Sequence, residues 1–124
     1  KNLSLAEGLS NVEVMRGDIE DIRGSNLPAG FFDFVIVSNV LFACEDRLAV
    51  AREVERIIKP TGRALIIDWR GSFDGMGPHE GHVFTAGAAR DVFEQAGLYY
   101  LGDVPAGEYH WGFVVRKNVL QPAQ

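Results

Sequence analysis

Two continuous apolar runs lie in the middle of the chain, and each ends in polar residues. The first run covers residues 34–37 and ends at Ser38, and the second covers residues 64–67 and ends at Asp68. Runs of this length predict strands that are buried on both faces of a parallel sheet. Ligands of open α/β sheets bind outside the carboxyl ends of the strands. The polar ends are therefore candidates for a binding edge, although an ordinary turn after a core strand gives the same pattern.

Apolar positions spaced three and four residues apart predict two helices. Residues 46–58 carry one apolar stripe, and Pro60 stops the helix that this stripe predicts. Residues 86–96 carry a second stripe. Thr85 is a favoured cap at its amino end, and Gly97 is a favoured stop after its carboxyl end.

Shorter alternating segments complete the pattern. Residues 12–15 predict a short strand, and residues 98–101 and 109–116 predict two more. The turn 102–108 is too short to hold a crossover helix, so the last two strands should pair antiparallel. The glycine-rich loop 70–84 has a length typical of lids and binding loops. The chain should therefore fold as an α/β domain with a parallel first part and a closing antiparallel hairpin.

Composition narrows the class of protein. The 124 residues, of which 47% are hydrophobic, predict one domain at residues 1–117 and a loose polar tail at residues 118–124. The net charge of −5 disfavours nucleic acid and anionic membranes as partners. No apolar run approaches the roughly 20 residues that span a bilayer, so we expect no membrane association. The single cysteine, Cys44, excludes an internal disulfide and fits a reducing cytoplasm.

Three stretches, taken together in their order and spacing, resemble a known family. They are Gly17–Ile19, Phe32–Phe42 and Ile58–Trp69. They resemble the class I S-adenosylmethionine-dependent methyltransferases, and most of all the type 11 and ubiquinone/menaquinone-biosynthesis-like groups. The resemblance extends to about Lys117. It implies a partial Rossmann-like fold: a mostly parallel sheet with helices on both faces and a carboxyl-terminal antiparallel hairpin.

The family pattern also has parts that this chain lacks. Its first strand, its glycine-rich loop, its first helix and its second strand would all precede Lys1. The chain is therefore expected to be the carboxyl-terminal portion of a methyltransferase, truncated ahead of the glycine-rich motif. A sheet without its two central strands has open edges, which favour homo-oligomers.

The resemblance assigns cofactor contacts residue by residue. Asp18 would accept a hydrogen bond from the adenine amino group, and the backbone N–H of Ile19 would meet a ring nitrogen. Ser38, Asn39 and Val40 match the segment beside the methionine part of S-adenosyl-L-methionine. The alternative for Asp18 is an ordinary Gly-Asp turn.

Methyl transfer needs alignment of the nucleophile, the methyl carbon and the sulfur, and a general base only if the acceptor must lose a proton. Asp68 ends a strand on the binding side and ranks first as that base, although it could equally cap the loop that follows. The other candidates are Glu45, Asp46, His79, His82 and His110. Phe42, Trp69 and His79 are candidates for substrate contact, with aromatic packing as the alternative for the two aromatic side chains.

A metal site is the alternative reading of His79 and His82, which stand three positions apart. Zinc would need further ligands that the sequence does not place beside them, so no metal is expected. The glycines at 75 and 77 follow no strand directly and open no helix, which disfavours a nicotinamide-binding domain. Cys44 lacks a basic neighbour that would activate it and reads as a structural thiol.

Two hypotheses from different classes remain. In the first, the chain is part of an enzyme that transfers a methyl group from S-adenosyl-L-methionine to a small-molecule acceptor. In the second, it is a non-catalytic remnant or association module that binds no cofactor.

Overall fold

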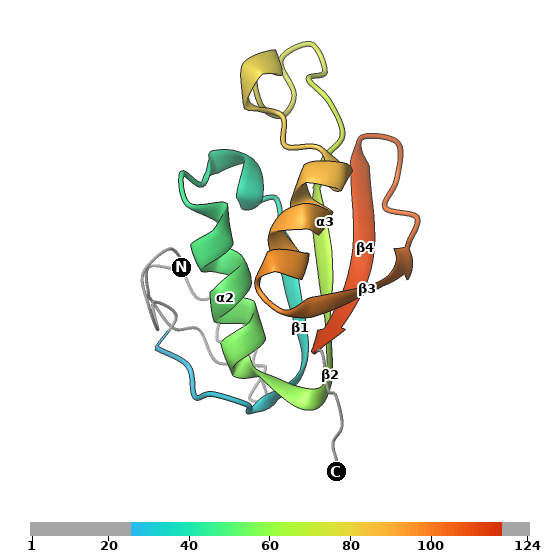
Figure 1. Cartoon of the computed structure of the whole chain (residues 1–124). Coiled ribbons are helices and arrows are strands. Elements are labelled where there is room, and N and C mark those ends of the chain that lie inside the picture. The colour runs from blue at the N-terminus through green and yellow to red at the C-terminus, as the bar shows by residue number, and fades with distance from the viewer. Residues whose placement is uncertain (1–25, 118–124) are drawn as a thin grey trace, which may run out of the picture.

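A computed structural model of the chain describes residues 26–117. The elements in this range are the strands β1 (Phe32–Ser38), β2 (Ile58–Trp69), β3 (Leu98–Asp103) and β4 (His110–Lys117), the helices α2 (Arg47–Ile57) and α3 (Ala86–Gln95), and the short 3₁₀ helices η1 (Leu41–Ala43) and η2 (Glu80–His82). Figure 1 shows them as a sheet with two helices in front. The predicted strand at residues 12–15, the cofactor candidates Asp18 and Ile19, and the predicted tail lie outside the described residues.

The four strands form one mixed sheet in the order β1-β2-β4-β3. β1 pairs parallel with β2, with Val37 beside Ile66. β4 pairs antiparallel with both β2 and β3. The predicted α/β class, the parallel pair and the closing hairpin are therefore confirmed. Since only one of the three pairings is parallel, the described sheet is mixed rather than mostly parallel.

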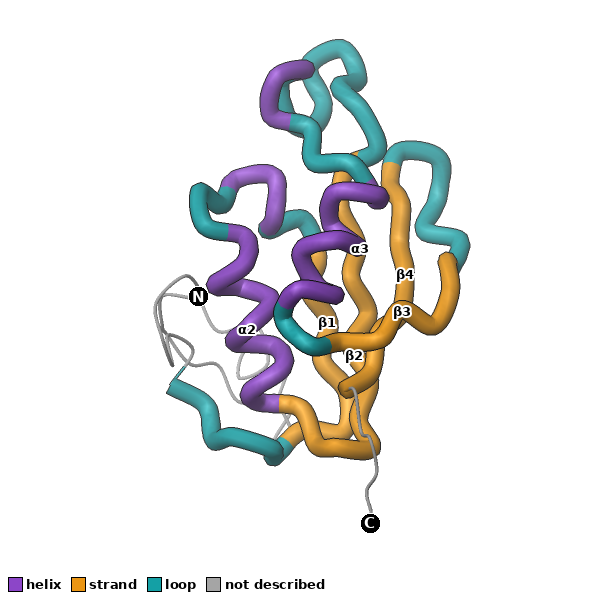
Figure 2. Tube along the Cα trace, viewed as in Figure 1, coloured by secondary structure: helices purple, strands orange, loops and turns teal. Residues whose placement is uncertain are grey.

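Both helices cover the same face of this sheet (Figures 1 and 2). Val54 of α2 and Phe93 of α3 belong to one buried cluster together with Ile66 of β2 and Phe113 of β4. Within residues 26–117, the expectation of helices on both faces is thus not met. The core lies between the two helices and the inward-facing side chains of β2 and β4.

β1 differs from its prediction in burial. Val37 is only 8% exposed, but Phe34 and Ile36 are 51% and 60% exposed. The prediction that this run is buried on both faces is therefore wrong for the described part of the protein. The reason is its position: β1 has β2 as its one neighbour in the sheet, and no described helix covers the outer face.

The helix boundaries follow the predicted signals. The Asp46 side chain accepts a hydrogen bond from the backbone N–H of Ala49 at the start of α2, and Thr85 does the same for Ala88 at the start of α3. α2 passes directly into β2, which begins six residues before the apolar run that predicted it. Gly62 permits this early pairing, because a Cβ there would lie 2.9 Å from the carbonyl oxygen of Phe32.

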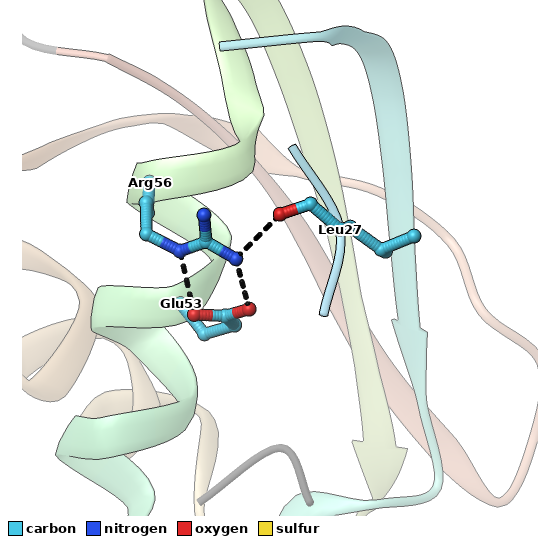
Figure 3. A network of polar contacts seen from close by, with 3 residues as sticks. All are labelled: Leu27, Glu53 and Arg56. Atoms are coloured by element: carbon cyan, nitrogen blue, oxygen red, sulfur yellow. Dashed lines mark hydrogen bonds and ion pairs between the residues drawn. The ribbon is translucent and has the colours of Figure 1, made fainter. Parts of the chain in front are cut away.

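A buried ion pair ties α2 to the segment before β1 (Figure 3). Glu53 is 3% exposed and accepts hydrogen bonds from Nε and Nη2 of Arg56, at 2.9 and 2.6 Å. The same guanidinium donates from Nη2 to the carbonyl oxygen of Leu27 at 2.7 Å. The hydrogen bond to Glu53 raises the pKa of Arg56. None of the helices in residues 26–117 combines the length and the apolar character needed to cross a membrane.

Candidate functional site

The polar segment that follows β1 turns sharply away from the sheet. Asn39 has a positive φ of 59°, a conformation that asparagine tolerates better than most residues. Its backbone N–H donates to the carbonyl oxygen of Ile67 at 3.0 Å. Ser38 and Asn39 are exposed and Val40 is half-buried. The three residues predicted to lie beside the cofactor therefore stand together at the carboxyl end of β1.

The next turn, η1, is held by Arg47 from the first turn of α2. Nε of Arg47 donates to the carbonyl oxygen of Leu41 at 2.6 Å, and Nη2 donates to that of Phe42 at 3.2 Å. The guanidinium also lies over the ring of Phe84, 4.1 Å from its centroid. Arg47 thus joins η1 to the end of the loop that precedes α3.

Asp68, the leading candidate base, is fully buried at the end of β2. Its Oδ1 accepts from the backbone N–H of Trp69 at 2.7 Å, and its Oδ2 accepts from that of Phe42 at 3.3 Å. Burial raises the pKa of the Asp68 carboxyl, while the hydrogen bonds from Trp69 and Phe42 and the charge of His110 partly offset that effect. The carboxylate contacts both the loop that follows β2 and the turn that follows β1.

A cavity of about 520 Å³ opens between η1 and the loop after β2. One wall comes from η1, the two residues after it and the start of α2, and it includes Phe42, Cys44, the predicted base candidate Glu45 and Arg47. The other wall comes from the loop and includes Pro78, His79 and His82. The rings of His79 and His82 lie 6.1 Å apart between centroids, and both residues are exposed. The structure thus brings together two of the three predicted substrate residues, Phe42 and His79.

Trp69, the third, lies beside this cavity without being part of its lining. Its ring packs on that of His110, 4.3 Å away between centroids. The backbone of Gly77 also lies close to the Trp69 ring: a Cβ at position 77 would be 2.8 Å from the ring atoms Cδ2 and Cε3. Nε2 of His110 is buried and has no hydrogen-bond partner in residues 26–117. Trp69 therefore supports the loop that forms one wall of the cavity.

Sequence reasoning missed the role of Arg47. Arg47 is a charged residue at the start of α2, yet it is half-buried and holds η1. A signal was present: a cation in the first turn of a helix opposes the helix dipole. Such a position is unfavourable unless another contact, here the carbonyl oxygens of η1, compensates.

No three His, Cys, Asp or Glu side chains within the described range lie close enough together to hold a metal ion. The side chains that line the cavity include an aromatic ring, a thiol, a carboxylate (Glu45), a guanidinium and two imidazoles. Residues 38–40 are not part of the lining, but they lie only two to four residues before Phe42 in the chain.

Comparison with known proteins decides the family. Residues 1–66 match the family described as "Methyltransferase domain". The chain belongs to this methyltransferase domain family. The matched residues include β1, the candidate cofactor residues Ser38, Asn39 and Val40, and the whole of η1 and α2.

One curated relative is an arsenite methyltransferase from Aquipseudomonas alcaligenes. It is 34% identical over 61 residues, which are 49% of this chain and 18% of the relative. The match thus spans about half of this chain and about a fifth of the length of that protein.

Solved structures agree on the fold. A SAM-dependent methyltransferase from Aquifex aeolicus matches 91% of this chain with a TM-score of 0.78 and 26% identity, and the match covers 58% of that protein. An S-adenosylmethionine-dependent methyltransferase from Mesorhizobium loti matches 92% of this chain with a TM-score of 0.71 and 15% identity, over 74% of its own length. The [4+2]-cyclase SpnF also matches, with a TM-score of 0.72 and 18% identity over 94% of this chain and 61% of its own. The last two likenesses establish a shared fold, which hosts more than one chemistry.

Proposed function

We propose that this chain takes part in the transfer of a methyl group from S-adenosyl-L-methionine to a small-molecule acceptor. The observation that carries the proposal is an adjacency. Ser38 ends β1, Asn39 and Val40 follow it, and Ser38 and Asn39 are exposed. Phe42, two residues further on, forms a wall of the cavity. One continuous segment would thus touch the cofactor with its first half and the acceptor with its second.

The residues present at the end of β1 suit the cofactor. Ser38 and Asn39 expose a hydroxyl and an amide, which can hydrogen-bond to an amino-acid moiety. The cofactor supplies a methyl group on a positively charged sulfur, and an acceptor nucleophile displaces that sulfur. The chain itself contributes orientation, because in-line displacement depends above all on the alignment of the reacting atoms. Asp18 and Ile19 remain the proposed contacts for the adenine ring.

The cavity suits a small acceptor. A volume of about 520 Å³ falls within the range of small-molecule sites. The net charge of −5 supports a small molecule rather than nucleic acid as the acceptor. His79 and His82 line the cavity and are exposed, so either can take a proton from a nucleophile there. The single cysteine supports a reaction that takes place in the cytoplasm.

The test is calorimetric titration of the folded chain with S-adenosylhomocysteine. Asn39→Gly removes the amide but keeps the positive φ, and we expect it to weaken binding about tenfold, the equivalent of one hydrogen bond. Asn26→Gly is the matched control, because Asn26 has a similar φ of 61° and should leave the affinity unchanged. A folded chain that does not bind S-adenosylhomocysteine, or an Asn39→Gly variant with full affinity, would overturn the proposal.

A second candidate function is association through β1. The observation that favours it is the exposure of Phe34 and Ile36 on a strand with one described neighbour. Exposed apolar strands at a sheet edge readily pair with another chain. If this function holds, sedimentation will show dimers that Ile36→Lys dissociates, whereas Met76→Lys, at an exposed apolar residue in the loop after β2, leaves them intact. A monomer at all concentrations would exclude it.

A further inference from the structure

The backbone of Phe42 is held from two sides by charged side chains. Its N–H donates to Oδ2 of Asp68 at 3.3 Å, and its carbonyl oxygen accepts from Nη2 of Arg47 at 3.2 Å. Arg47 also binds the preceding carbonyl oxygen, that of Leu41, at 2.6 Å. The carboxylate of Asp68, from β2, and the guanidinium of Arg47, from α2, thus bind the two peptide groups on either side of the Phe42 Cα.

The two anchors fix η1 relative to the two elements that carry them. Asp68 is the penultimate residue of β2, and Arg47 is the first residue of α2. Cys44 adds a local contact, since its thiol lies 3.3 Å from the carbonyl oxygen of Val40. Any rotation of η1 would therefore break a hydrogen bond to the sheet, to the helix or within the turn itself.

A packing role alone does not account for a fully buried acid at position 68. A carboxylate without solvent is costly unless its oxygens are hydrogen-bonded, and an apolar side chain would fill the same space at no such cost. The compensation comes from backbone N–H groups, one of which belongs to the wall of the cavity. The charge is thus directed at the segment whose position matters most to a bound acceptor.

We propose that Asp68 and Arg47 are positioning residues that together fix the backbone of Phe42 and, through it, the aromatic wall of the acceptor cavity. The description of that cavity as an acceptor site rests on the proposed function, whereas the positioning of Phe42 does not. Asp68 acts through Phe42 and Trp69 rather than on the acceptor. The charge that bears on the Asp68 carboxyl is that of His110, from the neighbouring strand β4. Arg47 binds the carbonyl oxygen of Phe42 in the same turn.

The first experiment follows the labelled full chain by NMR across the acid range, without any cofactor. We expect the amide resonances of Phe42 and Trp69 to shift with one common midpoint, above that of an ordinary aspartate. In Asp68→Asn, a variant of the same shape, both shifts should disappear. Asp91→Asn is the matched control at an exposed acid on α3, and it should leave both shifts intact.

The same spectra report whether the wall itself moves. In Asp68→Asn the ring resonances of Phe42 should lose dispersion, while those of Phe93, fully buried in the core, keep theirs. Retained Phe93 signals separate a local change from unfolding. An unshifted Phe42 amide in the wild type, or unchanged Phe42 ring signals in Asp68→Asn, would overturn the proposal.

The second experiment tests Arg47 by amide hydrogen exchange. Arg47→Lys keeps the charge but loses the planar fork that binds two carbonyl oxygens. We expect exchange at the amides of Ala43 and Cys44, which close η1, to become at least tenfold faster. Arg52→Lys, at an exposed position of the same helix, is the control and should change neither rate. Equal rates in Arg47→Lys and wild type would remove Arg47 from the proposal.

These outcomes are independent of cofactor binding. A chain that fails to bind S-adenosylhomocysteine but shows the shared titration of Phe42 and Trp69 contradicts the proposed function and supports the positioning of Phe42. A chain that binds S-adenosylhomocysteine but lacks that shared titration supports the proposed function and contradicts the positioning of Phe42.

Discussion

The buried carboxylate of Asp68 accepts a hydrogen bond from the backbone of Phe42, which lies 26 residues earlier in the chain. This contact joins the ends of β1 and β2, the two parallel strands of the sheet. It places the segment at the end of β1 beside the cavity that η1 and the loop 77–82 enclose.

The buried position of Asp68 predicts a pH dependence of stability. Because burial raises its pKa in the folded state, the folded state holds this proton more tightly than the unfolded state, where the pKa is about 3.9. The contribution of Asp68 to stability is thus greatest below that unfolded value and is lost as the pH rises through the folded-state pKa. Urea unfolding from below the unfolded-state pKa to above the folded-state pKa measures this. The free energy of unfolding of wild type relative to Asp68→Asn should fall as the pH rises. A difference that stays constant with pH would contradict the prediction.

The close approach of Gly77 to Trp69 predicts an unequal pair of variants. Gly75 and Gly77 have nearly equal φ angles of 85° and 84°, but only at position 77 would a Cβ meet the Trp69 ring. Both alanine substitutions incur the strain of a positive φ, and Gly77→Ala should lose about 1–3 kcal/mol more, the usual cost of overpacking. Urea unfolding measures the difference, and a shifted Trp69 fluorescence should accompany only Gly77→Ala. Equal losses would mean that the loop can move away from the ring.

The ion pair of Glu53 with Arg56 predicts that removing Arg56 lowers the free energy of unfolding, because the Glu53 carboxylate is buried. Arg56→Ala would remove two hydrogen bonds from the buried carboxylate of Glu53 and one from the carbonyl oxygen of Leu27. Since the Arg56 side chain is itself 21% exposed, we expect a loss of about 1–3 kcal/mol in the free energy of unfolding. Arg52→Ala, at an exposed residue one turn earlier in α2, should lose less than about 0.5 kcal/mol. Similar losses in the two variants would show that the pair contributes little.

The two faces of the sheet predict unequal losses of stability from the same substitution, isoleucine to alanine. Ile66 is fully buried beneath the helices, so Ile66→Ala should cost about 2–5 kcal/mol. Ile36 is mostly exposed on the outer face, so Ile36→Ala should cost less than about 1 kcal/mol in a dilute monomer. Chemical denaturation at two protein concentrations measures both values. A large, concentration-dependent loss in Ile36→Ala would instead show that another copy of the chain covers this face.

Local patterns were enough to predict most of the described elements. The caps Asp46 and Thr85 and the apolar stripes located both helices to within one residue at each end. The short turn after residue 101 correctly predicted an antiparallel hairpin, because chain length alone forbids a crossover there. Caps, stripes and turn lengths involve residues close in sequence, so the sequence by itself determined these features.

Only the tertiary structure decided which side chains meet. The run at β1 is apolar throughout, but its burial depends on which elements lie against each face, and the described helices cover one face alone. Phe42 and His79 were predicted together, whereas the hold of Asp68 and Arg47 on Phe42 was not. That hold depends on the register that places Ser38 beside Ile67, one residue before Asp68. Register is a property of paired strands, and no periodicity within either segment contains it.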